Sequence, residues 1–213
     1  MGILKREITQ ILPFDPKKYG IPPKFENYSL DNFEGNKPLV ERIRKFSNGG
    51  MVLNGKTGAG KTHLSVSIIR NLYMQKWIDH CNANIKRFED GEPIEHHYSF
   101  TATFVTVPDF LLEIRDTFKS GCDETEGSTI EKYSRFSLLV LDDLGSEKPS
   151  EHTIMALYNL IDHRDRELKD TVITTNLTLP QIEERLNSRI ASRLSAWDWI
   201  EIGMSDYRKN KKC

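Results

Sequence analysis

The order of apolar and polar residues along the chain predicts short buried strands that alternate with amphipathic helices. Four runs are apolar or β-branched on both faces, as strands inside a covered sheet are; they lie at 51–54, 103–107, 136–141 and 171–175. Apolar residues that recur every three or four positions predict helices, which begin near residues 37, 62, 108, 150 and 180. The alternation predicts an α/β domain with a parallel central sheet flanked by helices.

Three segments lack a sustained period. Residues 1–36 contain four prolines, which disfavour helix, and are predicted to form an extended, basic lead-in that rests on the core and is a candidate docking segment for a partner. We therefore place the main domain at 37–213. The polar stretch Trp77–Ser99 is predicted to be a loop, and residues 121–128 a flexible acidic link.

Composition excludes several classes of protein. The 213 residues are 38% hydrophobic and 29% charged, which is typical of a globular domain and not of a disordered or fibrous chain. No apolar run approaches the roughly 20 residues that cross a bilayer, and the N-terminus lacks the pattern of a signal peptide. These features predict a cytoplasmic protein with no membrane partner. A net charge of −1 requires that any contact with nucleic acid comes from a local patch.

The candidate chemistry begins where the first predicted strand ends. The pattern Gly-x-x-x-x-Gly-Lys-Thr is met at every position by Gly55, Lys56, Thr57, Gly58, Ala59, Gly60, Lys61 and Thr62. Glycines allow backbone N–H groups to surround a phosphate, and the start of the following helix favours negative charge. The pattern predicts that Lys61 contacts the β- and γ-phosphates of ATP and that Thr62 binds Mg²⁺. A glycine-rich turn with a solvated lysine is the alternative.

Polar residues follow two other predicted strands. Asp142 and Asp143 end the run LLVLDD, and Asn176 ends the run VITTN. Asp142 is the candidate ligand of Mg²⁺, and Asp143 the candidate acid that orients or deprotonates the attacking water. Asn176 is the candidate for positioning that water, unless it only caps its strand. The two aspartates alone are also compatible with a strand that ends in a turn.

Together, GKTGAGKTH, LLVLDDLG and VITTN resemble AAA+ ATPases of the initiator clade, most closely the DnaC/DnaI helicase loaders and the IstB transposition ATPases. IPPKFENYSLDNF and ALYNLIDHR are similar to further segments of that family. The resemblance implies an AAA+ P-loop core, binding and hydrolysis of ATP with Mg²⁺, and a nucleotide-dependent homo-oligomer. It also implies that His63 accompanies the phosphate loop, that Asp142 and Asp143 are the metal-binding and catalytic acids, and that Asn176 is the sensor residue.

The same resemblance implies an arginine that acts on the ATP of a neighbouring copy. The pattern Ser-Arg-hydrophobic occurs at Arg189 and at Arg193, and the spacing to the run WDWIEI favours Arg193. A helix face paired with Glu183 and Glu184 is the alternative for these arginines. The resemblance also implies contact with single-stranded DNA after the second strand, which makes Arg115 and Lys119 the candidate DNA contacts. Four positions apart on one predicted helix, they are expected to share a face; a solvated helix face is the alternative.

The chain departs from the family pattern in three ways. Asp143 stands where AAA+ proteins usually carry glutamate, and its shorter reach predicts slow, partner- or DNA-stimulated turnover. The chain ends near the predicted strand WDWIEI, so we expect no C-terminal lid domain. Family members also reach ATP with an arginine of that lid, and whether Arg208 takes its place is open. The long N-terminal helicase-binding domain of cellular loaders is also expected to be absent.

The favoured hypothesis is a nucleotide-controlled switch that loads a hexameric replicative helicase onto single-stranded DNA. One alternative is an IstB-like transposition helper that binds duplex DNA and a transposase. A second alternative is a P-loop small-molecule kinase, against which the DDLG and TTN segments and the Ser-Arg pattern favour an oligomeric ATPase.

Overall fold

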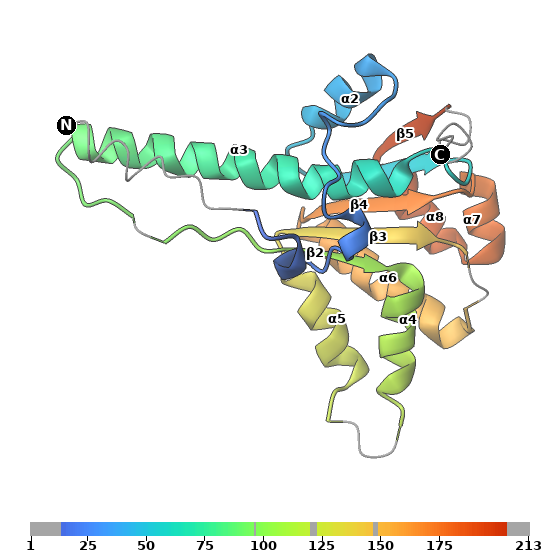
Figure 1. Cartoon of the computed structure of the whole chain (residues 1–213). Helices are drawn as coiled ribbons and strands as arrows, with labels where there is room; N and C mark the ends of the chain where they lie inside the picture. The colour runs from blue at the N-terminus through green and yellow to red at the C-terminus, as the bar shows by residue number, and fades with distance from the viewer. Residues whose placement is uncertain (1–13, 96, 120–122, 147–148, 204–213) are drawn as a thin grey trace.

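The computed structural model describes residues 14–95, 97–119, 123–146 and 149–203 (Figure 1). Its strands are β1 (Gly50–Gly55), β2 (Ala102–Thr106), β3 (Leu138–Leu144), β4 (Asp170–Thr175) and β5 (Asp198–Ile202). Its α-helices are α2 (Lys37–Arg44), α3 (Lys61–Glu89), α4 (Val107–Asp116), α5 (Glu126–Ser134), α6 (Glu151–Arg166), α7 (Leu179–Arg185) and α8 (Ser188–Ser195). Two short 3₁₀ turns, η1 (Pro16–Tyr19) and η2 (Pro23–Phe25), precede them.

The five strands form one sheet in the order β2-β3-β4-β1-β5, and every pair of neighbours is parallel. The predicted α/β architecture with a parallel sheet is confirmed. Because β1, β4 and β3 are adjacent, the residues that follow their carboxyl ends are brought to one edge of the sheet.

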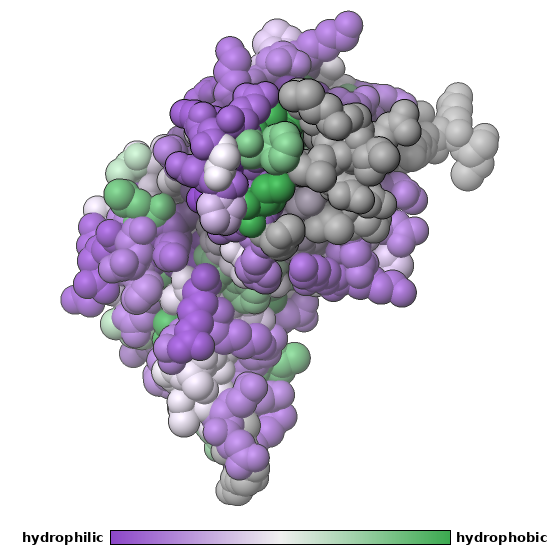
Figure 2. Space-filling view, turned by 90° about the vertical axis from the view of Figure 1, so that its left-hand side faces the viewer, coloured by the Kyte–Doolittle hydropathy of each residue, from purple (hydrophilic) through white to green (hydrophobic). Residues whose placement is uncertain are grey.

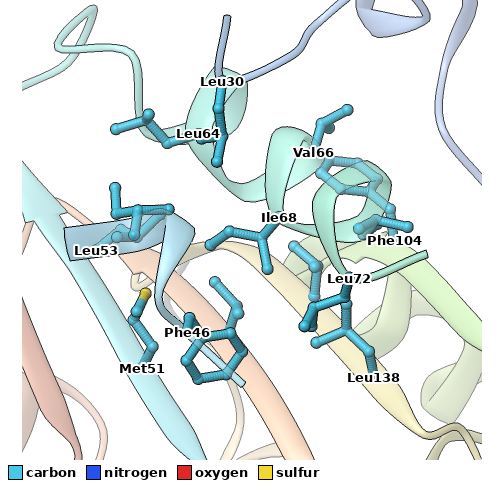
Figure 3. Packing of buried hydrophobic residues seen from close by; sticks show 14 of the residues in the cluster. Leu30, Phe46, Met51, Leu53, Leu64, Val66, Ile68, Leu72, Phe104 and Leu138 are labelled. Atoms are coloured by element: carbon cyan, nitrogen blue, oxygen red, sulfur yellow. The ribbon is translucent and has the colours of Figure 1, made fainter. Parts of the chain in front are cut away.

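Alternate residues of each strand point to opposite faces, and each face has its own core. In β1, Met51 and Leu53 pack on one side with α2, α3 and the lead-in, while Val52 packs on the other side with α4 to α8. Figure 3 shows the first core, in which side chains of α3 meet those of β1, β2 and β3. Apolar residues on both faces explain why the strands read as continuous apolar runs.

The lead-in lies on the first core, as predicted. Tyr19, Ile21, Leu30 and Phe33 are buried there, and Asp15 caps η1 through the N–H of Lys17 at 3.0 Å. The prediction of an extended conformation is corrected in part, because the prolines at the starts of η1 and η2 favour tight 3₁₀ turns. Residues 1–13 lie outside the described part of the chain, and the boundary at residue 36 stays a prediction.

The prediction of a loop at Trp77–Ser99 is wrong for most of that stretch. Helix α3 continues to Glu89 and extends beyond the sheet in Figure 1. Trp77, Cys81 and Asn84 continue its buried face, because the following segment folds back along the helix. The Asn84 side chain exchanges hydrogen bonds with the main chain of Glu95 at 2.8 and 2.9 Å. The partner of this helical face is thus supplied by residues too polar to show a period.

The predicted acidic link also contains the start of a helix. Helix α5 begins at Glu126, where Thr125 and Ser128 form a capping box. Its buried residues are few, with Tyr133 packing edge-on against Phe110 of α4. A nine-residue helix with so short an apolar face gives a weak periodic signal.

The face in Figure 2 is mostly hydrophilic, with its apolar side chains in separate small areas. Within the described part of the chain, no helix is both long and apolar enough to cross a lipid bilayer.

A buried arginine ties together the amino-terminal edge of the sheet. Arg164 of α6 is fully buried, and burial lowers its pKa to about 10, so that it stays charged at neutral pH. Its guanidinium donates hydrogen bonds of 2.6–3.2 Å to the carbonyls of Tyr133, Ser134, Phe136 and Asp170 and to the hydroxyl of Thr171. One side chain therefore joins α6 to the end of α5 and the starts of β3 and β4.

Replacement of this arginine by an apolar residue of similar length should destabilise the fold. Arg164→Met leaves several buried carbonyls without donors, each at a cost of about 1–3 kcal/mol, so the loss should exceed about 3 kcal/mol. Urea unfolding followed by circular dichroism measures it. Arg166→Met is the matched control: Arg166 is 65% exposed, and its ion pair with Asp162 contributes about 0–1 kcal/mol. Equal stability of the two variants would contradict this account of Arg164.

Candidate nucleotide-binding site

The predicted phosphate loop joins β1 to α3. Gly58 and Gly60 have φ values of 81° and 91°, in the left-handed region that favours glycine. A Cβ on Gly60 would also lie 2.6 Å from the ring of Phe33, so the lead-in closes the loop from one side. The N–H of Ala59 donates to Lys56 O at 3.1 Å and tightens the turn. The loop residues thus have the backbone freedom that wrapping a phosphate requires.

The side chain of Lys61 lies over this loop. Its ammonium group donates to the carbonyl oxygens of Gly55 at 2.8 Å and Lys56 at 3.0 Å. Because Gly60 has no side chain to cap α3, the helix begins with its backbone N–H groups facing the loop. A lysine and a helix start at one turn concentrate positive charge, as a phosphate site needs.

The structure brings the side chains of Thr62 and Asp142 together at the start of α3. The Thr62 hydroxyl lies 3.0 and 3.2 Å from the two carboxylate oxygens of Asp142. The Thr174 hydroxyl donates to the same carboxylate at 2.7 Å. Burial raises the pKa of Asp142, and the hydrogen bonds from Thr174 and Thr62 oppose that rise. A buried carboxylate beside a hydroxyl is a set of hard oxygen donors that fits Mg²⁺.

Asp143 points the other way because β3 bulges at this point. The register between β3 and β4 steps from Leu141–Ile173 to Leu144–Thr175, which gives β3 one extra residue. Asp143 takes the left-handed conformation, with φ of 66°, and is exposed. The bulge therefore separates the predicted metal ligand, which faces inward, from the predicted catalytic acid, which faces solvent.

Asn176 follows the end of β4, next to β3, and is exposed. Sequence reasoning missed two side chains beside these elements. The Thr174 hydroxyl contacts Asp142 and the N–H of Asp143, and Asn54 at the end of β1 donates to Leu177 O at 2.7 Å. The paired threonines of VITTN were the available signal for Thr174, since hydroxyls on a fully buried strand need partners.

His63 faces the lead-in and not the loop interior. Its ring stacks on Tyr28 with centroids 4.1 Å apart, and its Nε2 lies 3.0 Å from Ser29 O and 2.9 Å from Asn32 Oδ1. Its predicted part in nucleotide binding stays a prediction, while the contacts make it a link between α3 and the lead-in.

The two candidate arginines of α8 differ in their surroundings. Arg193 contacts Asp162 of α6 through Nη2 at 2.7 Å and through Nε at 2.9 Å. These contacts raise the pKa of Arg193. Arg189 is exposed and lies over the ring of Tyr158, 5.7 Å from its centroid. The acids that Arg193 contacts therefore belong to α6, and not to the Glu183 and Glu184 of the alternative interpretation.

The candidate DNA contacts do not share a helix face. Helix α4 ends at Asp116, so Lys119 lies beyond the helix. The expectation that Arg115 and Lys119 lie one turn apart on the same helix is therefore wrong. Lys119 pairs with Asp116 at 2.6 Å, while Arg115 is exposed on the last turn of α4. Arg208 lies outside the described residues.

Within the described residues, no group of three or more His, Cys, Asp or Glu side chains is arranged to hold a metal ion. His80 and Cys81 lie on α3, and Cys81 is buried.

The chain is similar in sequence to proteins named as replicative helicase loaders. The loader DnaC of Buchnera aphidicola subsp. Baizongia pistaciae is 23% identical over 193 residues, which cover 87% of this chain and 69% of that protein. DnaC of Escherichia coli K12 is 23% identical over 201 residues, covering 89% and 72%. The predicted resemblance to DnaC loaders is confirmed. No protein-family model matches the chain.

Solved structures show the same fold. The DnaC helicase loader has a TM-score of 0.63 at 22% identity, covering 85% of this chain and 99% of that chain. DnaI has a TM-score of 0.62 at 21% identity, covering 88% and 94%. The replication initiator DnaA bound to AMPPCP and single-stranded DNA has a TM-score of 0.61 at 19% identity, covering 86% and 51%. These structures share the predicted fold, an α/β domain with a parallel central sheet flanked by helices.

The structure predicts different costs for alanine at Gly49, which precedes β1, and at Gly60 of the phosphate loop. Gly49→Ala places a Cβ in open space at φ of 83°, so it should cost only the left-handed strain of about 1–2 kcal/mol. Gly60→Ala adds the overlap with Phe33 and should destabilise the chain further and weaken nucleotide binding. Urea unfolding and fluorescence titration of labelled ATP measure both effects. Gly60→Ala with the stability and affinity of Gly49→Ala would contradict the proposed fit against Phe33.

Proposed function

We propose that this chain, a relative of the DnaC helicase loaders, is an ATP-binding replication protein that loads a hexameric replicative helicase onto single-stranded DNA. The observation that carries the proposal is the contact of Thr62 with Asp142 beneath a complete phosphate loop. The sequence of the chain is also similar to those of named helicase loaders, at 23% identity over 87–89% of its length. These relatives do not favour a transposition helper or a small-molecule kinase.

In this proposal the loop binds the phosphates of ATP. Backbone N–H groups at the start of α3 surround the phosphate oxygens, and Lys61 turns from Gly55 O and Lys56 O to the β- and γ-phosphates. The oxygens of Thr62 and Asp142 hold Mg²⁺, which neutralises phosphate charge when bound.

Hydrolysis is assigned to the residues at the ends of β3 and β4. The exposed Asp143 orients the attacking water and accepts its proton, and Asn176 helps to position that water. The short aspartate side chain makes turnover slow, so that DNA or a partner stimulates it. Arg193 of a neighbouring copy completes the site in a nucleotide-dependent homo-oligomer, because a fixed cation stabilises charge on the transferring phosphate.

Arg193 must leave Asp162 before it reaches a neighbour's nucleotide. In this account assembly exchanges an ion pair within one copy for a contact between copies. Single-stranded DNA is assigned to the side of α4, where Arg115 is exposed and Lys119 is shared with Asp116. A contact with phosphate through Arg115 is independent of base sequence.

Loss of the loop lysine should remove nucleotide control of the helicase complex. Lys61→Ala deletes charge-assisted hydrogen bonds worth about 1.5–3 kcal/mol, so ATP affinity should fall about 10- to 100-fold. Native mass spectrometry with the hexameric replicative helicase of its host should show a complex with an ATP analogue that weakens with ADP. Lys76→Ala, farther along α3, is the matched control.

Two outcomes would count against the proposal. ATP affinity unchanged in Lys61→Ala would remove the phosphate-loop assignment. A helicase complex absent with either nucleotide, while the chain still assembles on DNA, would make the transposition helper the better hypothesis.

Mixing two inactive variants tests the shared site. Asp143→Asn keeps its arginine, and Arg193→Ala keeps its acid, so a mixture should recover some phosphate release that neither variant shows alone. Arg189→Ala is the comparison, and it should hydrolyse ATP without a partner variant. No recovery at any mixing ratio would contradict a role of Arg193 between copies, and recovery only with Arg189→Ala would move that role to Arg189.

A further inference from the structure

One hydroxyl contacts both aspartates at the end of β3. The Thr174 Oγ1 donates to Asp142 Oδ1 at 2.7 Å and accepts the backbone N–H of Asp143 at 2.9 Å. Thr174 lies on β4, directly beside the bulge of β3. It therefore connects the side chain of the first aspartate with the main chain of the second.

The bulge makes this hydroxyl necessary. An extra residue in a strand interrupts the ladder, and the displaced backbone groups need other partners. Here the N–H of Asp143 finds a side-chain oxygen. Asp143 also carries the strain of a left-handed non-glycine residue, which persists only where the surroundings fix it.

Water has little access to take the place of this hydroxyl. Thr174 is 1% exposed and Asp142 is 6% exposed. Loss of the hydroxyl would leave the partly buried N–H of Asp143 unpaired and would remove one donor from the buried carboxylate of Asp142. Thr62 of α3 is the other donor to that carboxylate. The hydrogen bonds of its hydroxyl reach Asp142 and not Asp143.

We propose that Thr174 is a positioning residue of the nucleotide site, which orients the Asp142 carboxylate for Mg²⁺ and holds Asp143 in its outward-facing conformation. The inference rests on the proposed ATPase function and adds a residue to its machinery. Thr174 acts through the two aspartates and needs no contact with the nucleotide. Its hydroxyl, and not its methyl group, carries the role.

Three variants isolate the hydroxyl. Thr174→Val removes it and keeps the shape of the side chain, whereas Thr174→Ser keeps it. Thr171→Val is the matched structural control, because Thr171 lies at the other end of β4 and its hydroxyl also accepts and donates one hydrogen bond each, with Arg164 at 2.9 Å and Lys169 O at 3.0 Å. Thermal unfolding of all three variants reports the structural cost.

The measurements are the affinity for a fluorescent ATP analogue with and without Mg²⁺, and kcat and KM for phosphate release. For Thr174→Val we expect unchanged affinity without Mg²⁺ and a gain of affinity on adding Mg²⁺ that is about 10- to 100-fold smaller than in the unaltered chain. The kcat should fall by a similar factor with little change in KM. Thr174→Ser should restore both values, and Thr171→Val should lower only the unfolding temperature.

The outcomes separate this inference from the proposed function. An unchanged effect of Mg²⁺ in Thr174→Val would overturn the role of Thr174, as would equal losses in Thr171→Val. Absence of hydrolysis by the unaltered chain would count against the proposed function alone, since the effect of Mg²⁺ on binding would still decide the role of Thr174. Failure of Thr174→Val to fold would leave the decision to Thr174→Ser, whose loss of the Mg²⁺ effect would overturn the inference.

Discussion

The loop after β1, the aspartates of β3 and the asparagine after β4 lie at one edge of the sheet because all of its strands run in the same direction. In a parallel sheet the residues that follow each strand collect at one edge, whatever their separation in sequence. Thr62 and Asp142 are 80 positions apart, yet their oxygens lie 3.0 Å from each other. The order β3-β4-β1 is the constraint from which the geometry of the site follows.

The opposite edge of the sheet provides the stability that this arrangement requires. There a fully buried guanidinium, that of Arg164, donates to carbonyls from three segments. A buried charge is stable only when its N–H groups all have hydrogen-bond acceptors. The segments that supply these acceptors are therefore fixed in position relative to one another. The amino-terminal edge is therefore satisfied within the chain, and the carboxyl-terminal edge carries the exposed polar groups that a ligand can use.

The site itself is locally unfavourable. Burial raises the pKa of Asp142, and Asp143 holds a left-handed backbone, both of which cost free energy in the absence of a ligand. A bound cation would offset the first cost by its charge. On α8, the charge of Arg193 is likewise balanced within the chain, by its ion pair with Asp162. In the proposed function this arginine acts on a neighbouring copy, so the ion pair holds it when no neighbour is bound.

The sequence by itself determined the alternation of strands and helices, the phosphate loop and the acidic strand end, because these depend on short-range patterns. Apolar runs specify strands that are covered on both faces, and a glycine-rich turn before a helix has few other uses. The cap of α6 by Ser150 and the proline in the first turn of α7 are equally local signals.

Only the tertiary structure decided where α3 ends, which way each aspartate faces and what Arg193 contacts. The distal part of α3 is covered by a segment that returns to it from Glu95 onward, and that segment is too polar to show a hydrophobic period. The bulge at Asp143 depends on the register of β4, and the ion pair of Arg193 depends on how α8 packs against α6. Contacts between segments far apart in sequence leave no local pattern, so the fold was needed to show them.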